Sequence, residues 1–215
     1  MSSIPAPSEP TEVLRNTPMQ QRSTTRVTLL LDAAAALIDE NGIDGLTTSD
    51  VAARSESSVG VVYRYYPNIQ SLLLALAARN LERFTERTVH LLESQSTEFL
   101  SGLDPVIDLA VDMARNEPGF RALRFGALID RRFAEGRTST HAQLSSAFTK
   151  FMSNRYGVAV TPELELDVEV AVEVSEALLQ RAFQYDKSGD ERFIAKARTI
   201  IRDLLEPYAD EASAA

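Results

Sequence analysis

The stretch SSVGVVYRYYPN, residues 57–68, decides the fold, because its composition is compatible with either a strand or a helix. Its valines and tyrosines favour a strand by propensity, since β-branched and aromatic side chains lose rotamer freedom against a helical turn. A strand over residues 59–66 would place Gly60 and Arg64 on one face with Val62, so that this face would not be cleanly apolar. The pattern therefore favours a short helix.

A helix over the same residues separates the apolar positions from the polar ones. Val59, Val62 and Tyr66 then share one side and are expected to pack inward. Tyr63 and Tyr65 fall on the outer and flanking sides, where their hydroxyl groups can donate hydrogen bonds to phosphate oxygens. The alternative is a core helix with half-buried tyrosines and no part in nucleic-acid binding.

Cap and turn residues on both sides support the helical interpretation. Ser58 can cap this helix, and Pro67 ends it by disfavouring α geometry in the residue before it. Upstream, Thr47 and Asp50 have the spacing of a capping box and predict a second short helix that ends near Arg54. Two short helices joined by a tight turn predict a helix-turn-helix unit.

The flanking sequence predicts helices almost throughout. A stripe of apolar residues predicts a longer first helix that ends at Gly42, through Val27, Leu30, Leu31, Ala34 and Ile38. Helical periodicity between turn-rich breaks predicts further helices over residues 69–93, 104–115, 118–134, 140–155, 162–185 and 190–205. No pair of strands with hairpin chemistry is apparent, so the chain is expected to be all-α.

The same punctuation predicts the domain organisation. Proline-rich residues 1–21 are expected to form a disordered tail and residues 22–67 the helix-turn-helix domain. Residues 68–207 would form a larger helical bundle, and residues 208–215 a second tail. The chain has 215 residues, of which 44% are hydrophobic, so a sizeable core is expected.

Composition argues against several kinds of function. The chain has no cysteine and only two histidines, His90 and His141, so neither a metal site nor another cofactor is expected. It has no Ser/His/Asp set and no Gly-rich phosphate loop, so we expect no enzyme activity. Without a long apolar run or a signal-peptide pattern, we expect a cytoplasmic protein with no membrane partner. The net charge of −9 disfavours nucleic acid unless basic and hydroxyl groups gather on one face.

Residues 22–81, about 60 residues, carry a resemblance to a known family. The segments LLDAAAALIDEN (30–41) and GIDGLTTSDVAARSESSVGVVYRYYPNIQSLLLAL (42–76) resemble the N-terminal DNA-binding domain of the TetR family of transcriptional regulators. The resemblance implies a repressor that binds a palindromic operator in double-stranded DNA as a homodimer and is released by a small, largely apolar ligand. The alternative is a helical small-molecule-binding or interaction module with lost or weak DNA binding.

The resemblance also implies which residues contact DNA. Thr48 and Tyr65 match positions that contact phosphate, and Ser49 matches one that can reach a base edge. The residues that begin the recognition helix match positions that face the major groove. The full set implied for the DNA interface is Arg26, Thr48, Ser49, Ser58, Val59, Gly60, Val61, Tyr63, Arg64 and Tyr65.

For the larger half, the resemblance implies a ligand cavity and a dimer interface, although each apolar residue could instead belong to an ordinary bundle core. The residues expected to line the cavity are Ile107, Val111, Phe120, Leu123, Phe125, Leu128, Phe148 and Phe151. The acidic helix over residues 162–185 and the basic final helix are expected to form the dimer. Its interface residues would be Val168, Val172, Leu179, Phe183, Ile194, Ile201 and Leu205.

The DNA-binding segment departs from the family pattern in three respects. Ser55, Glu56 and Ser57 replace the usual turn with its left-handed glycine, so a strained or differently shaped turn is expected. Ile69 stands where a phosphate-binding lysine is common. Residues 22–67 carry four arginines against six carboxylates, a net charge of −2, so non-specific DNA affinity is expected to be weak.

Overall fold

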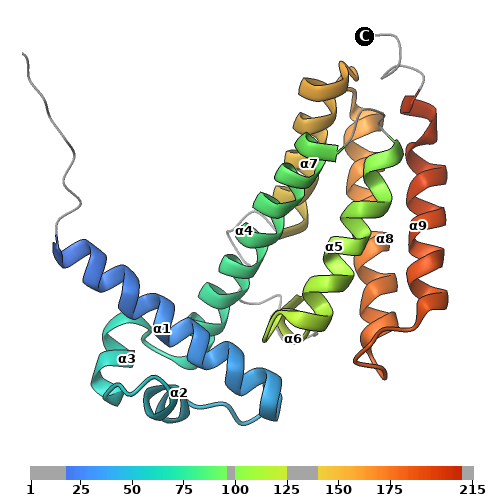
Figure 1. The fold of residues 1–215 in the computed structure, drawn as a ribbon. Coiled ribbons are helices and arrows are strands. Elements are labelled where there is room, and N and C mark those ends of the chain that lie inside the picture. Colours follow the sequence, from blue (N-terminus) through green and yellow to red (C-terminus); the bar gives the residue numbers. More distant parts are fainter. Residues whose placement is uncertain (1–17, 96–99, 125–139, 210–215) are drawn as a thin grey trace, which may run out of the picture.

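The computed structural model describes residues 18–95, 100–124 and 140–209, and these ranges contain helices and no β-strand (Figure 1). The expected all-α class is therefore confirmed. Three helices at one end form what we call the head: α1 Pro18–Asn41, α2 Thr48–Arg54 and α3 Val59–Tyr65. Helix α4, Ile69–Gln95, runs from the head into a helical bundle (Figure 1).

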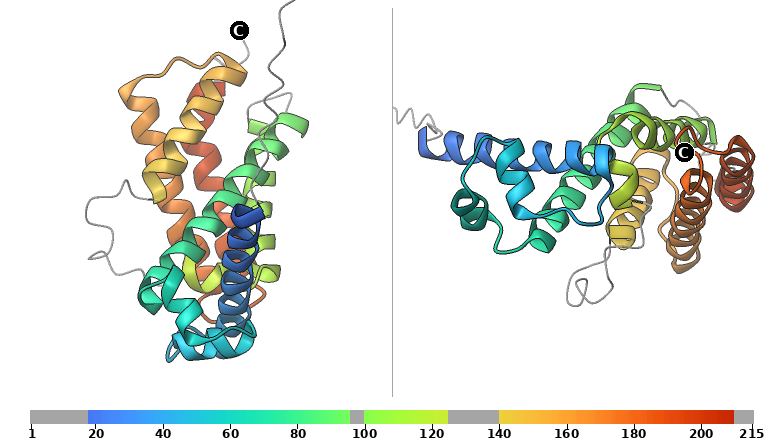
Figure 2. Two further views of the ribbon diagram at one scale, coloured as in Figure 1. Left: turned by 90° about the vertical axis from the view of Figure 1, so that its left-hand side faces the viewer. Right: turned by 90° about the horizontal axis from the view of Figure 1, so that it is seen from below.

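The bundle combines α4 with the remaining helices, which are α5 Leu103–Asn116, α6 Phe120–Arg124, α7 Thr140–Tyr156, α8 Pro162–Phe183 and α9 Glu191–Leu205. Two short 3-10 turns, Leu100–Gly102 and Glu206–Tyr208, precede α5 and follow α9. Seen from below, the head lies at one side of the molecule and α9 at the other (Figure 2).

Local capping explains why the short helices of the head form. The Thr47 side chain accepts a hydrogen bond from the backbone of Asp50, whose carboxylate accepts one from the backbone of Thr47, as the predicted capping box requires. Ser58 caps α3 by accepting from the backbone N–H of Val61. Gly42 ends α1 with a φ of 79°, the left-handed conformation that glycine adopts without steric cost.

The molecule has two hydrophobic cores, and α4 contributes to both. Leu72 and Leu76 are fully buried in the core of the head, whereas Phe84 and Leu92 are buried in the core of the bundle. The head core also receives Leu123 from α6. The expected boundary at residue 67 assigns the whole of α4 to the second domain. The first half of α4 is nevertheless packed into the core of the head.

The predicted ends of the chain need correction. Helix α1 begins at Pro18, inside the segment 1–21 that was expected to be a disordered tail. At the other end, Tyr208 is part of a 3-10 turn, and its hydroxyl donates to Oδ2 of Asp167 at 2.7 Å. The helix expected over residues 118–134 is described only as α6, and the rest of that range lies outside the described residues.

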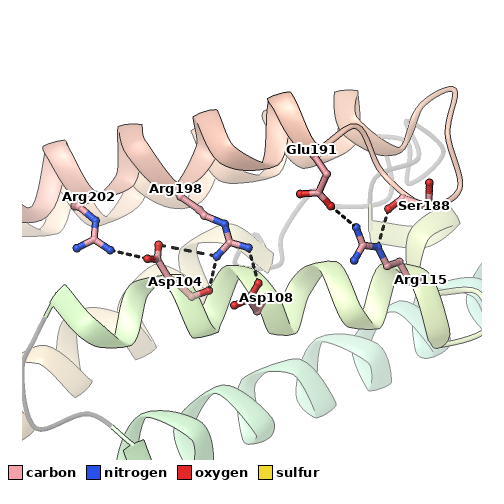
Figure 3. Close-up of polar contacts among 7 residues, drawn as sticks. All are labelled: Asp104, Asp108, Arg115, Ser188, Glu191, Arg198 and Arg202. Carbon is pink, nitrogen blue, oxygen red and sulfur yellow. Dashed lines mark hydrogen bonds and ion pairs between the residues drawn. The ribbon is translucent and has the colours of Figure 1, made fainter.

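Ion pairs hold α9 against α5 (Figure 3). Arg202 Nη2 lies 2.6 Å from Oδ2 of Asp104. Arg198 pairs with Asp108 and also donates to the backbone carbonyl of Asp104 at 3.0 Å. These two cations of the final helix therefore serve contacts within the protomer, because they point toward α5 and not toward the acidic residues of α8.

The same two helices are joined at the other end by Arg115. Its Nε donates to the carbonyl of Ser188 at 2.6 Å, and Nη2 lies 2.8 Å from Oε1 of Glu191 (Figure 3). The surface-exposed pairs each contribute little, about 0 to 1 kcal/mol, so packing of the apolar face of α9 dominates its attachment.

The turn between α2 and α3 keeps a left-handed residue although it lacks glycine. Glu56 adopts a φ of 50°, and the turn is closed by a 2.9 Å hydrogen bond from the N–H of Ser57 to the carbonyl of Ala52. A residue with a Cβ pays about 1 to 2 kcal/mol for this conformation. The strain expected in this turn is therefore found at Glu56.

This conformation makes a prediction about stability. Glu56→Gly should raise the free energy of unfolding by about 1 kcal/mol, because glycine removes the steric cost of the left-handed conformation. The matched control Glu56→Gln removes the charge but keeps the Cβ, and should stay within about 0.5 kcal/mol of the parent. Urea unfolding followed by circular dichroism measures both variants, and equal values would show that charge and not conformation matters here.

Candidate DNA interface and ligand cavity

The inner side of α3 anchors this helix to the head. Val62 is fully buried, and Tyr66, the residue that ends α3, is 8% exposed. Burial raises the pKa of the Tyr66 hydroxyl, with an opposing effect from the charge of Arg79. Val59 is 38% exposed, so the expectation that it packs inward with them is wrong. Val59, the first residue of α3, therefore lies on the outer surface, whereas Val62 one turn later faces the head core.

The outer side of α3 carries most of the residues that the sequence assigned to DNA. Tyr63 is 52% exposed, and Gly60 and Arg64 are also exposed, whereas Val61 and Tyr65 are half-buried. Of the other assigned residues, Ser49 and Ser58 are exposed and Arg26 is half-buried. These side chains come from α1, α2, α3 and the cap of α3. The three helices share one hydrophobic core, so the side chains are carried by the same packed domain.

Thr48 lies differently from its predicted role. It is only 8% exposed, and its hydroxyl donates to the hydroxyl of Tyr63 at 3.3 Å. The bond links the start of α2 to the outer side of α3. In this structure Thr48 therefore orients Tyr63, and its side chain presents little surface for a phosphate contact.

The cations of the head are largely engaged in contacts within it. Both terminal nitrogens of Arg54 donate to the carboxylate of Glu40, and this hydrogen bonding lowers the pKa of Glu40. Arg26 Nη1 donates to the Ser57 hydroxyl at 3.1 Å, which ties α1 to the turn before α3. Ile69 packs partly buried against the head core, so this side chain stabilises the fold.

A cavity of about 90 Å³ lies in the bundle among α4 to α9. Its walls are almost entirely apolar, and the volume exceeds the roughly 10 to 15 Å³ that a single water needs. Three of the residues predicted for a ligand site line it: Ile107, Phe148 and Phe151. The cavity is therefore large enough and apolar enough to hold a small apolar molecule.

The other predicted lining residues lie elsewhere. Val111 and Phe120 are buried in the bundle core outside the cavity wall, and Leu123 belongs to the head core. Phe125 and Leu128 lie outside the described residues. Helical periodicity identified the buried side of each helix, but it could not show which buried positions border a void.

Sequence reasoning missed the polar residues of the cavity wall. Arg124, at the end of α6, forms an ion pair with Glu176 of α8, with Nε 3.0 Å from Oε1 and both side chains 13% exposed. The guanidinium lies over the Phe84 ring at 5.4 Å from its centroid. Burial lowers the pKa of Arg124, and the carboxylate of Glu176 opposes this effect. A lone arginine and a glutamate 52 positions apart give no signal in the sequence.

The residues predicted for the dimer interface are buried inside the protomer. All seven have 7% or less of their surface exposed. Five of them line the cavity, namely Val168, Val172, Leu179, Ile201 and Leu205, and Phe183 and Ile194 lie elsewhere in the bundle core. They are therefore not available to a second protomer. The prediction that these positions are apolar and buried is confirmed, but the prediction that they contact a second protomer is wrong. In the structure α8 and α9 pack these side chains against the other helices of the same bundle.

Helix α8 instead exposes a second apolar strip. Leu166 is 59% exposed and Val170 is 38% exposed. One to two turns further on, Val174 is half-buried and Ala177 is exposed. These four residues are spaced by three or four positions and share one side of the helix, which we call the outer face of α8. On α9, Ile200 is also half-buried.

The cavity makes a prediction about core packing. Ala171→Val adds methyl groups beside the void and should change the free energy of unfolding by less than about 1 kcal/mol. Ala34→Val, in the fully packed head core, should lower it by about 1 to 3 kcal/mol because no space is available. Both changes carry the same helix-propensity cost, so the difference in urea midpoint reports the space alone. Equal losses would mean that the cavity is closed in solution.

Two further features of the described residues bear on function. No group of three or more His, Asp or Glu side chains in these ranges is arranged to hold a metal ion. None of the described helices combines the length and the hydropathy needed to cross a membrane.

Comparison with known proteins places the chain in a family. Residues 98–209 match the tetracyclin repressor-like C-terminal domain, and residues 30–76 match the bacterial regulatory proteins of the tetR family. A TetR-family transcriptional regulator of known structure from Streptomyces coelicolor is 35% identical, with a TM-score of 0.74 over 86% of this chain and 98% of that chain.

Two curated relatives share a smaller part of their length. The HTH-type transcriptional repressor KstR of Rhodococcus jostii is 31% identical over 126 residues, which make up 52% of this chain and 59% of that protein. KstR of Mycolicibacterium smegmatis is 34% identical over 59 residues, 27% of this chain and 29% of that protein. The chain thus matches less than two thirds of the length of either repressor. With both domain models matched and a whole-length structural relative, the chain belongs to the TetR family of transcriptional regulators.

Proposed function

We propose that this chain is a cytoplasmic transcriptional repressor that binds a palindromic DNA operator as a homodimer and releases it when a small, largely apolar ligand occupies the bundle. The observation that carries the proposal is the exposed side of α3, with Val59, Gly60 and Tyr63 outward on a capped helix that Val62 anchors. Two curated repressors of the same family support the sign of regulation.

Each outward residue suits one kind of DNA contact. Gly60 lets the backbone approach the bases, and the methyl groups of Val59 and Val61 can contact thymine methyl groups in the major groove. Tyr63, held by Thr48, and the guanidinium of Arg64 suit phosphate oxygens, which position the protein without reading sequence. The head thus combines an apolar reading surface with a small number of phosphate donors.

This division of roles leads to a prediction for DNA titrations. Arg64→Ala should weaken binding to operator and to unrelated duplexes by similar factors and reduce the salt slope by about one, because a phosphate contact releases counterions without reading bases. Val61→Ala should alter preference at one or two base pairs and leave unrelated duplexes unaffected.

The measurement is fluorescence anisotropy at several salt concentrations, with the protein's own upstream intergenic DNA and a randomised operator library. Val62→Ala is the control, because this residue is fully buried and should lower stability without changing sequence preference. A loss on Arg64→Ala that is confined to one operator sequence would contradict its phosphate role.

The proposed dimer uses the outer face of α8 together with Ile200 of α9. Burying Leu166 and Val170 against a second copy would remove exposed apolar side chains from water, which favours association. The exposed carboxylates of Glu163 and Glu169 and the exposed ammonium group of Lys196 would then lie at the rim. For the dimer to read a palindromic operator, its two α3 helices must lie about 34 to 36 Å apart, one turn of DNA.

Two glutamate substitutions distinguish this face from the buried stripe. Leu166→Glu should give folded monomers that lose operator affinity, because it puts a charge into the interface while the protomer core stays intact. Ile201→Glu should unfold or strongly destabilise the protomer, because it buries a charge in the bundle core. Ser146→Glu, an exposed position on α7, is the matched control. Sedimentation velocity and circular dichroism test all three, and a dimeric Leu166→Glu protein would exclude the outer face of α8.

Ligand release requires that the two halves communicate. Helix α4 contributes to both cores, and α6 places Leu123 in the head core and Arg124 in the cavity wall. A ligand shifts DNA binding only if it prefers one arrangement of the heads over another, since equal affinity shifts nothing. We propose that α4 and α6 together carry this preference from the cavity to α3.

The second candidate is a small-molecule-binding or interaction module with weak or lost DNA binding. The acidic head favours it, because Arg54 is paired with Glu40 and the segment carries a net charge of −2. A footprint of the purified protein on its own upstream intergenic DNA distinguishes the two. Protection of a palindromic site supports the repressor, and no protection at low salt supports the module.

A further inference from the structure

A groove separate from the bundle cavity lies where α4 leaves the head. Helices α1 and α4 share the core of the head, and from there α4 continues into the bundle (Figure 1). The groove lies between residues 24–31 of α1 and residues 78–86 of α4 and has a volume of about 620 Å³. Pockets for small ligands span roughly 300 to 1,000 Å³, so its size is suitable. None of its lining residues also lines the bundle cavity.

The lining of the groove is mostly apolar. Leu31 is buried, Val27 and Leu81 are half-buried, and Ala78 leaves its small side chain exposed. The two lining stretches are each about 10 to 12 Å long at the helical rise, which is long enough for two fused aromatic rings. A molecule that packs against this lining removes apolar surface from water, which favours binding.

Two carboxylates at the groove have no partner among the described residues. Glu82 and Glu86 both line the groove, are both exposed and lie one turn apart on the same side of α4. Neither forms an ion pair or a side-chain hydrogen bond within the described part of the chain. Like charges at this spacing repel each other, so a cation placed beside them would be stabilised.

The arginines of this stretch of α4 are held by other acids. Arg79, which also lines the groove, has Nη1 2.6 Å from Oδ1 of Asp32 on α1. Arg83 and Arg87 have terminal nitrogens 3.7 Å and 2.6 Å from the carboxylate of Glu117. With the two groove glutamates included, these three arginines stand against four carboxylates, a net charge of −1. The groove therefore combines an apolar lining with uncompensated negative charge.

We propose that this groove is a ligand site for a hydrophobic cation, a molecule with an aromatic or aliphatic body and one ammonium or amidinium group. The body packs against Val27, Leu31 and Leu81, and the charged group lies beside Glu82 and Glu86. A neutral molecule of the same shape gains the apolar contact alone. An anion of the same shape is repelled by the two carboxylates.

The site is distinct from the proposed effector cavity, and the proposal does not rest on the proposed function. A ligand in the groove contacts α1, which belongs to the head, and the part of α4 that leads into the bundle. Binding is therefore measured on the full-length protein without DNA. A protein that protects no operator can still bind the cation, and a cation that fails to bind leaves the repressor assignment untouched.

The test uses three probes of nearly equal size: naphthylmethylammonium, naphthylmethanol and naphthoate, titrated by calorimetry at low ionic strength. The ammonium compound should bind at least about fivefold more tightly than the alcohol, because it gains two exposed charge contacts, and naphthoate should bind most weakly. In about 1 M salt, where the Debye length is about 3 Å, the ammonium compound and the alcohol should become nearly equal. Binding of none, or an alcohol or naphthoate that binds as tightly as the ammonium compound at low salt, would overturn the proposal.

Three variants test the residues directly, and circular dichroism confirms that each is folded. The double variant Glu82→Gln with Glu86→Gln should bind the ammonium compound and the alcohol within about twofold of each other, because both charge contacts are gone. Glu93→Gln is the matched control, an exposed glutamate of α4 outside the groove, and should keep the preference. Ala78→Leu fills the groove and should weaken both probes by similar factors. A double variant that keeps the full preference would exclude the two glutamates.

Methyl NMR of the full-length protein locates the probe and tests other occupants. Resonances of Val27, Leu31 and Leu81 should shift on titration, whereas shifts confined to Ile107 of the bundle cavity would overturn the proposal. Contacts from residues 1–17 to the groove methyl groups in the free protein would assign the groove to that segment instead. Loss of self-association on titration, followed by sedimentation velocity, would assign it to a second copy of the chain. Either result would contradict a ligand site.

Discussion

Helix α4 cannot shift without repacking one of two hydrophobic cores, and the rest of the architecture depends on this constraint. Its first half is fixed in the head by Leu72 and Leu76, and its second half in the bundle by Phe84 and Leu92. Well-packed cores resist small displacements and tend to switch between discrete arrangements. A continuous helix shared by both cores therefore transmits a change in either half as a movement of the whole element.

The cavity lies inside the bundle, and its wall combines two kinds of residue. Most of the lining is apolar, which favours any hydrophobic molecule of suitable size. The ion pair of Arg124 with Glu176 adds the only charged side chains among the described lining residues.

The sequence predicted the head well because its signals are local. The capping box at Thr47 and the cap at Ser58 act within three residues, and both are present in the structure. Long-range choices were not predictable in the same way. The stripe containing Ile201 was correctly found to be buried, but periodicity cannot tell a core from an interface, and the pairing of Arg198 with α5 depends on tertiary packing. Glu56 shows a third case, in which the backbone hydrogen bonds that close the turn accompany a conformation that its own side chain disfavours.

The internal pairing of cations in the head has a consequence for how such a protein would search a genome. In the head, Arg54 is held by Glu40, and just beyond it Arg79 of α4 is held by Asp32. Residues 22–67 also carry a net charge of −2, so little net positive charge is available to hold the protein on arbitrary sequence. Sliding along DNA depends on that sequence-independent attraction. If the head binds an operator, it would find the site mainly by separate collisions from solution, and the time to occupy the site would follow the number of copies in the cell.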